Sequence, residues 1–201
     1  MKFIGITGGV GAGKSTVLDL LKQECNCKIV LCDDVAAELM TVGHDVFEDI
    51  KKLNWPFKVF ENDEIIRQEM ARALYTDKEL LEELNAIVHP AVKKYVLTKR
   101  DELEKQGKCD YFFIEAALLI EDGYDKLVDE LWYISVPGDI RRKRLKESRG
   151  YSDERIDNML KNQLSDEDFI AGSNRVIDNS KDVDYTRSQI RKILDSIDTT
   201  N

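Results

Sequence analysis

Short runs of apolar residues alternate along this chain with longer stretches in which apolar positions recur at helical spacing. This alternation is typical of βαβ units, in which helices connect parallel strands and cover the sheet. The runs predict five strands, at residues 2–7, 28–32, 111–114, 131–136 and 175–177. The pattern therefore predicts an α/β protein with three layers and a five-stranded parallel sheet.

Nearly eighty residues separate the second and third predicted strands. A βαβ crossover can be as short as about a dozen residues, so the excess predicts a helical insertion. Because proline disfavours helical geometry in the residue before it, we expect His89-Pro90 to end one helix and begin the next. The apolar positions on one face of the first helix are Leu80, Leu81, Leu84, Ile87 and Val88. A final helix is predicted from Ile190, Ile193, Leu194 and Ile197.

The segment GGVGAGKS at residues 8–15 fits the pattern G-x-x-x-x-G-K-[ST] and lies between a predicted strand and a predicted helix. Glycines allow several backbone N–H groups to turn inward and form a nest for phosphate oxygens at a helix N-terminus. Lys14 then places positive charge on the β- and γ-phosphates, and Ser15 offers its hydroxyl to Mg²⁺. The residues that we expect to bind ATP are Gly9, Val10, Gly11, Ala12, Gly13, Lys14, Ser15 and Thr16.

A phosphate-binding loop does not by itself decide the chemistry, because GTPases, motors and small-molecule kinases share it. A GTPase needs the base-reading motif N-K-x-D, and the run NSKD at residues 179–182 has the wrong order. The chain is also too short for a motor protein. A small-molecule kinase and a nucleotide-binding regulatory module remain as alternatives.

Six segments in order carry a more specific resemblance. They read TGGVGAGKST from Thr7, CDDVAAELM from Cys32, LNAIVHP from Leu84, ALLIE from Ala117, RRKRL from Arg141 and VIDN from Val176. With these segments, which span nearly the whole chain, the sequence resembles the dephospho-coenzyme A kinase family. The resemblance implies a P-loop kinase fold and transfer of the ATP γ-phosphoryl group to the ribose 3′-hydroxyl of dephospho-CoA, the last step of coenzyme A synthesis.

The same resemblance implies roles for individual residues. Asp33, which aligns with the family's carboxylate when Gly43 is matched to its glycine, would activate the acceptor hydroxyl. Arg141 and Arg144 would lie in a lid over ATP and act in catalysis together with Lys14 of the loop. The residues implied to contact the acceptor are Arg67, His89 and Leu118.

The resemblance also divides the single folded unit of residues 1–201 into parts. The core would comprise residues 1–43, 109–137 and 170–201. A helical insertion at about 44–108 would bind the CoA moiety, and the lid would lie at about 138–169.

From the residues alone, several of these positions have a second interpretation. Either Asp33 or Asp34 would serve equally well as a helix N-cap. Glu115 ends a predicted strand beside the loop, where it would orient Mg²⁺ through water or pair with a lysine. His89 also fits a helix break. Charge runs such as the one at residues 141–146 are often solvated helix faces, although arginines also stabilise a transferring phosphoryl group.

Composition limits the classes of partner and the cellular location that we expect for this protein. A net charge of −9 argues against a nucleic-acid partner, because proteins that bind nucleic acids carry a basic face. The opening apolar run is too short for a signal peptide or a membrane span, so we expect a cytoplasmic protein without a membrane partner. Its four cysteines have no metal-ligand spacing and are expected to be buried and reduced. We expect a monomer or small homo-oligomer.

Overall fold

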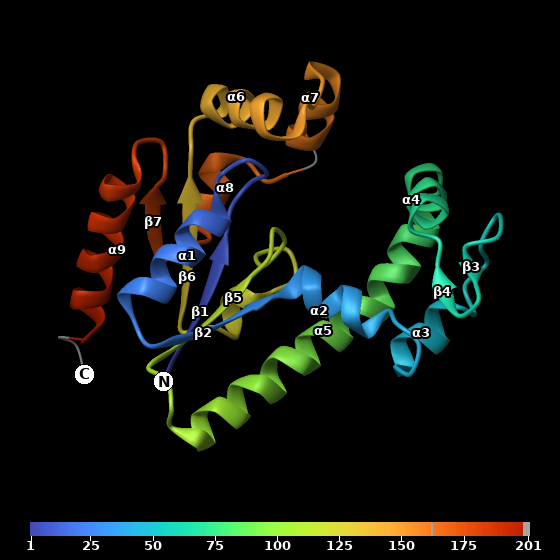
Figure 1. Cartoon of the computed structure of the whole chain (residues 1–201), viewed down its shortest axis with the longest axis horizontal. Coiled ribbons are helices and arrows are strands. Elements are labelled where there is room, and N and C mark those ends of the chain that lie inside the picture. The colour runs from blue at the N-terminus through green and yellow to red at the C-terminus, as the bar shows by residue number, and fades with distance from the viewer. Residues whose placement is uncertain (162, 199–201) are drawn as a thin grey trace. The chain divides into compact units, whose positions relative to one another are not determined.

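A computed structural model describes residues 1–161 and 163–198 and contains a five-stranded parallel sheet with flanking helices (Figure 1). The strand order is β2-β5-β1-β6-β7. The strands are β1 (Lys2–Thr7), β2 (Cys27–Leu31), β5 (Tyr111–Glu115), β6 (Glu130–Ser135) and β7 (Arg175–Asp178). Each begins and ends within one residue of its predicted bounds. The predicted fold class is therefore confirmed.

The central strands are buried on both faces, which explains their continuous apolar sequences. In β5 and β6 the residues Phe112, Phe113, Ile114, Trp132 and Ile134 have no exposed surface. The sheet is flanked by α1 (Lys14–Glu24), α8 (Asp166–Ala171) and α9 (Val183–Asp198), while α6 (Gly138–Arg149) and α7 (Asp153–Lys161) lie beyond the carboxyl ends of its strands, and a 3₁₀ turn covers Tyr124–Lys126 (Figure 1). Helices α1 and α9 pack against each other, and α8 packs against β6.

The chain divides into two compact units. One comprises Met1–Ile29 together with the chain from Leu103 onward, and the other comprises Val30–Glu102. The second unit contains α2 (Cys32–Leu39), α3 (Asp45–Ile50), β3 (Phe60–Glu61), β4 (Glu64–Ile65), α4 (Arg67–Thr76) and most of α5 (Lys78–Gln106). The expected functional division into core, acceptor-binding insertion and lid stays a prediction.

Helix α5 runs without interruption through Pro90, so the predicted break at His89-Pro90 is wrong. A proline inside a helix costs about 3 kcal/mol, because it removes a hydrogen bond and crowds the preceding turn. Burial of an apolar side chain is worth roughly 1.5–3 kcal/mol. Apolar residues on both sides of the proline are buried along the helix, and together they outweigh the penalty. They are Leu80, Leu84, Val88, Val92, Val96 and Leu103.

The insertion also contains a β-hairpin that the sequence interpretation missed. Strands β3 and β4 pair antiparallel, with Phe60 opposite Ile65. The two residues of the turn, Asn62 and Asp63, have positive φ angles of 50° and 59°. Asn and Asp tolerate this conformation better than other residues with a side chain, and tight hairpins require it. The pair Asn62-Asp63 was therefore the available signal.

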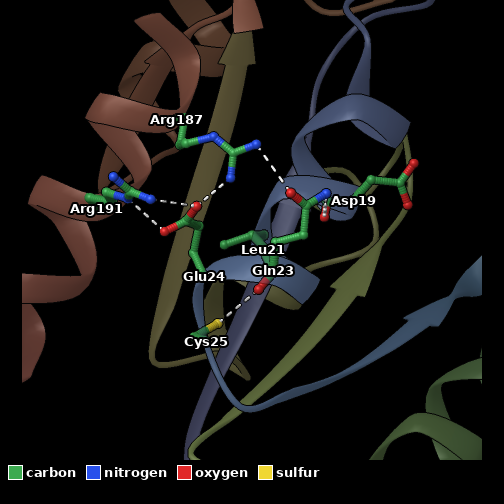
Figure 2. A network of polar contacts seen from close by, with 7 residues as sticks. All are labelled: Asp19, Leu21, Gln23, Glu24, Cys25, Arg187 and Arg191. Carbon is green, nitrogen blue, oxygen red and sulfur yellow. Dashed lines mark hydrogen bonds and ion pairs between the residues drawn. The ribbon is translucent and has the colours of Figure 1, made fainter. Parts of the chain in front are cut away.

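The four cysteines are all free, as expected. Cys32 and Cys109 are buried, whereas Cys25 and Cys27 are only half-buried. The prediction of burial therefore holds for two of the four. The Cys25 thiol donates to the carbonyl oxygen of Leu21 at 3.3 Å (Figure 2).

Two arginines of α9 hold the carboxylate at the end of α1 (Figure 2). Arg191 donates to Glu24 from Nε at 2.6 Å and from Nη2 at 3.1 Å, and Arg187 donates to the same carboxylate. Arg187 also donates to Gln23. The hydrogen bonds from Arg191 and Arg187 lower the pKa of Glu24. This cluster joins the C-terminal end of α1, the helix that begins at the glycine-rich loop, to α9.

We expect Glu24→Gln to lower the melting temperature at neutral pH and to have little effect in acid. The folded-state pKa of Glu24 lies below its unfolded value, so the carboxylate contributes stability above the unfolded pKa and loses it as the pH falls through the folded pKa. The thermal unfolding temperatures of the two proteins should therefore converge as the pH falls below the folded-state pKa of Glu24. Asp19→Asn, at an exposed carboxylate of the same helix, is the control and should have a smaller effect. A difference for Glu24→Gln that persists unchanged in acid would contradict the prediction.

Candidate active site

The glycine-rich loop connects the end of β1 to the start of α1, as predicted. Gly13 is the N-cap of α1 and adopts the left-handed conformation, with a φ of 79°. A side chain at this position would also place a Cβ atom 2.5 Å from Nδ2 of Asn179. A Cβ atom at Gly9 would lie 2.9 Å from Oε1 of Gln163 and would collide with Arg141. Backbone strain and close neighbours therefore both require glycine in this loop.

Lys14 lies at the start of α1 and reaches back over the loop. Its Nζ donates to the carbonyl oxygen of Gly8 at 2.8 Å and lies 3.4 Å from Oε1 of Glu115. Both charged side chains are largely buried, with exposed fractions of 17% and 14%. The structure thus shows the lysine pairing of Glu115, which was one of its two interpretations. A role of Glu115 toward Mg²⁺ stays a prediction.

The first turns of α6 bring Arg141 against the loop, as its close approach to Gly9 shows. Its Nη2 pairs with Asp166 at 3.2 Å, and the side chain is only 11% exposed. Its Nε is buried and has no hydrogen-bond partner among the described residues. Buried donors in native proteins are nearly always satisfied, so this one indicates a missing acceptor. Arg141 is therefore not part of a solvated helix face.

Arg144 lies one turn further along α6, and its Nη2 donates to the carbonyl oxygen of Asn179 at 2.8 Å. Asn179 follows β7 and is buried. Its Nδ2 donates in turn to the carbonyl oxygen of Ala12 in the loop. The structure therefore brings Arg141, Arg144 and the loop together within the first unit.

Three further residues of this site were missed by the sequence interpretation. Oε1 of Gln163 accepts a hydrogen bond from the backbone N–H of Val10 at 3.2 Å. Asp166, the first residue of α8, accepts from the hydroxyl of Tyr133 at 2.7 Å as well as from Arg141. Burial, followed by this bond to Asp166, raises the pKa of Tyr133 to about 12. The tyrosine therefore stays protonated and holds the carboxylate that orients Arg141. No local motif marks these residues, because their partners are distant in sequence.

Asp33 and Asp34 lie in the first turn of α2 and are both exposed. The helix begins directly after β2, at Cys32. Neither is the N-cap, which is Leu31. Carboxylates in a first turn are favoured by the helix dipole, which offers a reason for helix formation here.

The second unit contains a cavity of about 550 Å³ between α2, α4 and the β-hairpin. Arg67 lines it, together with Ala37 of α2 and Met40, the C-cap of that helix. Asp33 precedes Ala37 by four positions and Asp34 precedes it by three, so helical spacing places both aspartates near this side of α2. Adjacent residues of a helix differ by about 100° around its axis, so the two carboxylates still point in different directions.

The other two residues expected to contact the acceptor lie elsewhere. His89 is half-buried on α5 and is not among the described residues that line this cavity. Leu118 follows β5 in the first unit and is 39% exposed. The structure therefore does not group Arg67 and His89 around one cavity.

The chemistry of the loop fits Mg²⁺ bound mainly through a nucleotide. Among residues 1–161 and 163–198, no cluster of three or more His, Cys, Asp and Glu side chains would hold a metal ion. Mg²⁺ is usually held by one or two protein oxygens, waters and substrate phosphates rather than by a protein cage. The exposed hydroxyl of Ser15, at the start of α1, suits such a site. In the part of the chain that the structure describes, no helix is both long and apolar enough to cross a membrane.

Comparison with known proteins agrees with this geometry. The family model described as dephospho-CoA kinase matches residues 2–184. The dephospho-CoA kinase of Carboxydothermus hydrogenoformans is 33% identical over 194 residues, which cover 96% of this chain and 93% of that protein.

Solved structures show the same fold. The crystal structure of TT1252 from Thermus thermophilus has a TM-score of 0.81 and 27% identity, and the match covers 97% of each chain. The dephospho-CoA kinase of Campylobacter jejuni, at 22% identity, has a TM-score of 0.73 with 99% of this chain and 98% of that chain covered. The resemblance drawn from the sequence is thus confirmed, and the chain belongs to the dephospho-CoA kinase family.

Proposed function

We propose that this protein transfers the γ-phosphoryl group of ATP to the ribose 3′-hydroxyl of dephospho-CoA, which yields coenzyme A and ADP in the final step of coenzyme A synthesis. The main structural support is the buried Arg141, whose Nε lacks a partner among the described residues beside a phosphate-binding loop. A phosphate oxygen would supply the acceptor that this donor lacks. Family membership identifies the reaction.

On the ATP side, the loop N–H groups and Lys14 bind the phosphates. Arg141 and Arg144 stabilise the negative charge that spreads over the transferring phosphoryl group. Ser15 would hold Mg²⁺, and Glu115 would orient one of its waters. The ion would neutralise charge on the β- and γ-phosphates.

On the acceptor side, the Asp33 carboxylate accepts the hydrogen bond of the 3′-hydroxyl and takes its proton as the new P–O bond forms. The cavity lined by Arg67 is mostly apolar and suits the hydrocarbon part of the acceptor, while Arg67 is the lining cation that would meet its phosphate and must offset the nearby carboxylates of Asp63 and Glu64. We assign residues 44–108 to acceptor binding and residues 138–169 to the lid. His89 and Leu118 are proposed as further acceptor contacts.

The four free thiols suit a reducing compartment, and we propose that the protein acts in the cytoplasm. It would do so as a monomer or small homo-oligomer. Its overall negative charge opposes the binding of anionic substrates, so the cations near the loop must offset that repulsion locally.

The test of the function is a panel of acceptors supplied separately with Mg-ATP. Dephospho-CoA, adenosine and a sample without acceptor are compared by the release of ADP, and ³¹P NMR locates the new phosphate. We expect rapid transfer with dephospho-CoA only, at the 3′ position. Transfer to adenosine alone would indicate another small-molecule kinase, and slow release independent of acceptor would indicate a regulatory nucleotide-binding module.

We expect Arg144→Ala to lower kcat by about a hundredfold or more while the KM for dephospho-CoA changes little. Its charge acts on the transferring phosphoryl group and is needed most in the transition state. Steady-state kinetics with both substrates varied makes the measurement. Lys143→Ala is the matched control, because Lys143 is 74% exposed on the same helix. A raised KM for dephospho-CoA with unchanged kcat would show that Arg144 contacts the acceptor instead.

A further inference from the structure

Asn179 occupies a fixed position between the sheet and the phosphate-binding loop. It follows β7 directly, is 5% exposed, and its backbone N–H donates to the carbonyl oxygen of Ser135 at 2.9 Å. Its own carbonyl oxygen accepts the hydrogen bond from Arg144. The backbone of this residue is thus held at the carboxyl ends of β6 and β7.

The side chain of Asn179 bridges the loop and α9. Nδ2 donates to the carbonyl oxygens of Ala12 at 2.8 Å and Gly13 at 3.4 Å. Oδ1 accepts from the hydroxyl of Thr186 at 2.9 Å, and Thr186 is fully buried. Because carbonyl oxygens can only accept, the nitrogen of the amide must face the loop. The orientation of the amide is therefore determined by its partners.

These two bonds act on the peptide groups that present N–H donors to phosphate. In a planar trans peptide the C=O and the following N–H point in opposite directions. When Asn179 holds the carbonyl of Ala12, the N–H of Gly13 is turned away from Asn179. The carbonyl of Gly13 also accepts from the N–H groups of Thr16 and Val17, so α1 itself orients the Gly13–Lys14 peptide and the longer bond from Asn179 adds to that. N–H groups at the start of a helix have no helical partner and are available to anions.

We propose that Asn179 is a positioning residue for ATP binding: it holds the Ala12–Gly13 peptide group in the orientation in which the N–H of Gly13 binds the β- and γ-phosphates. The left-handed conformation of Gly13 and the lack of space for a side chain there belong to the same arrangement. Thr186 contributes by holding the amide oxygen. The inference rests on the proposed use of ATP.

The test compares ligands that differ in their phosphates. Calorimetry measures the affinity of wild type, Asn179→Ala and Thr186→Val for ATP, tripolyphosphate and AMP, with no acceptor present. We expect Asn179→Ala to weaken ATP and tripolyphosphate by about 10- to 100-fold, since each loses well-oriented hydrogen bonds to a charged group. AMP should change less than about threefold. Thr186→Val, which keeps the shape of the side chain, should act in the same direction with a smaller effect.

Asn174→Ala is the matched control, because Asn174 precedes the same strand and its Oδ1 accepts from the backbone N–H of Leu131 at 2.7 Å. It should leave all three affinities unchanged. Circular dichroism establishes that each variant is folded, and Thr186→Val carries the test if Asn179→Ala does not fold.

Unchanged affinity for tripolyphosphate in the folded variants would overturn the inference, as would an equal loss for AMP and ATP. A wild-type protein that binds neither ATP nor tripolyphosphate would instead overturn the proposed function.

Discussion

Replacing Lys14 by methionine should reduce phosphoryl transfer by at least about a thousandfold while the fold is retained. The cation lies at the start of α1 and reaches over the loop, where it would neutralise charge on the transferring phosphoryl group. Methionine has a similar length and apolar character along its stem but carries no charge. The measurement is single-turnover transfer to dephospho-CoA, with circular dichroism as the check on folding.

Lys22→Met provides the control for this substitution. Lys22 lies on the same helix, is 60% exposed and pairs only weakly with Asp19. It should leave turnover unchanged. Near-normal turnover of a folded Lys14→Met variant would show that the loop does not serve phosphoryl transfer.

Asp33→Asn should retain folding and ATP binding yet lose turnover by roughly two or more orders of magnitude, the usual scale for a general base. An amide of the same size can accept the hydrogen bond of the acceptor hydroxyl but does not accept its proton at neutral pH. The exposed position of Asp33 makes a large loss of stability unexpected. Steady-state transfer to dephospho-CoA tests the loss of turnover, and the affinity for ATP, measured on the same variant, tests the retained nucleotide binding.

Asp34→Asn is the comparison that makes this prediction specific. Both aspartates lie in the first turn of α2 with their carboxylates pointing in different directions, and the family resemblance assigns the base to Asp33. Asp34→Asn should therefore be mild. A severe loss confined to Asp34→Asn would show that the assignment of the base is displaced by one residue.

The strands and the phosphate-binding loop were predictable because their signals are local. Apolar runs such as the one in β5 need only be buried, and the glycines and Lys14 of the loop stand at fixed spacing between a strand and a helix. The alternation of strands and helices along the chain then favours a parallel sheet. Family membership was predictable because the six signature segments occur in the family's order.

The wrong predictions concern segments whose local sequence preference is overridden by tertiary packing or is too weak to be seen. Pro90 predicted a helix break, but buried side chains on both sides keep α5 continuous. Asp33 and Asp34 were candidates for the N-cap, but they lie in the first turn of α2, whose N-cap is Leu31. The hairpin was missed because two-residue strands carry almost no periodic signal.

The sequence by itself determined the fold class, the loop and the family, since each depends on residues that are neighbours in the chain or recur at regular spacing. Only the tertiary structure decided which side chains hold the loop and its arginines. Asp166 reaches Arg141 across 25 positions, and Asn179 reaches Ala12 across 167. Such contacts form where the sheet brings strand ends together, and no pattern along the chain encodes those distances.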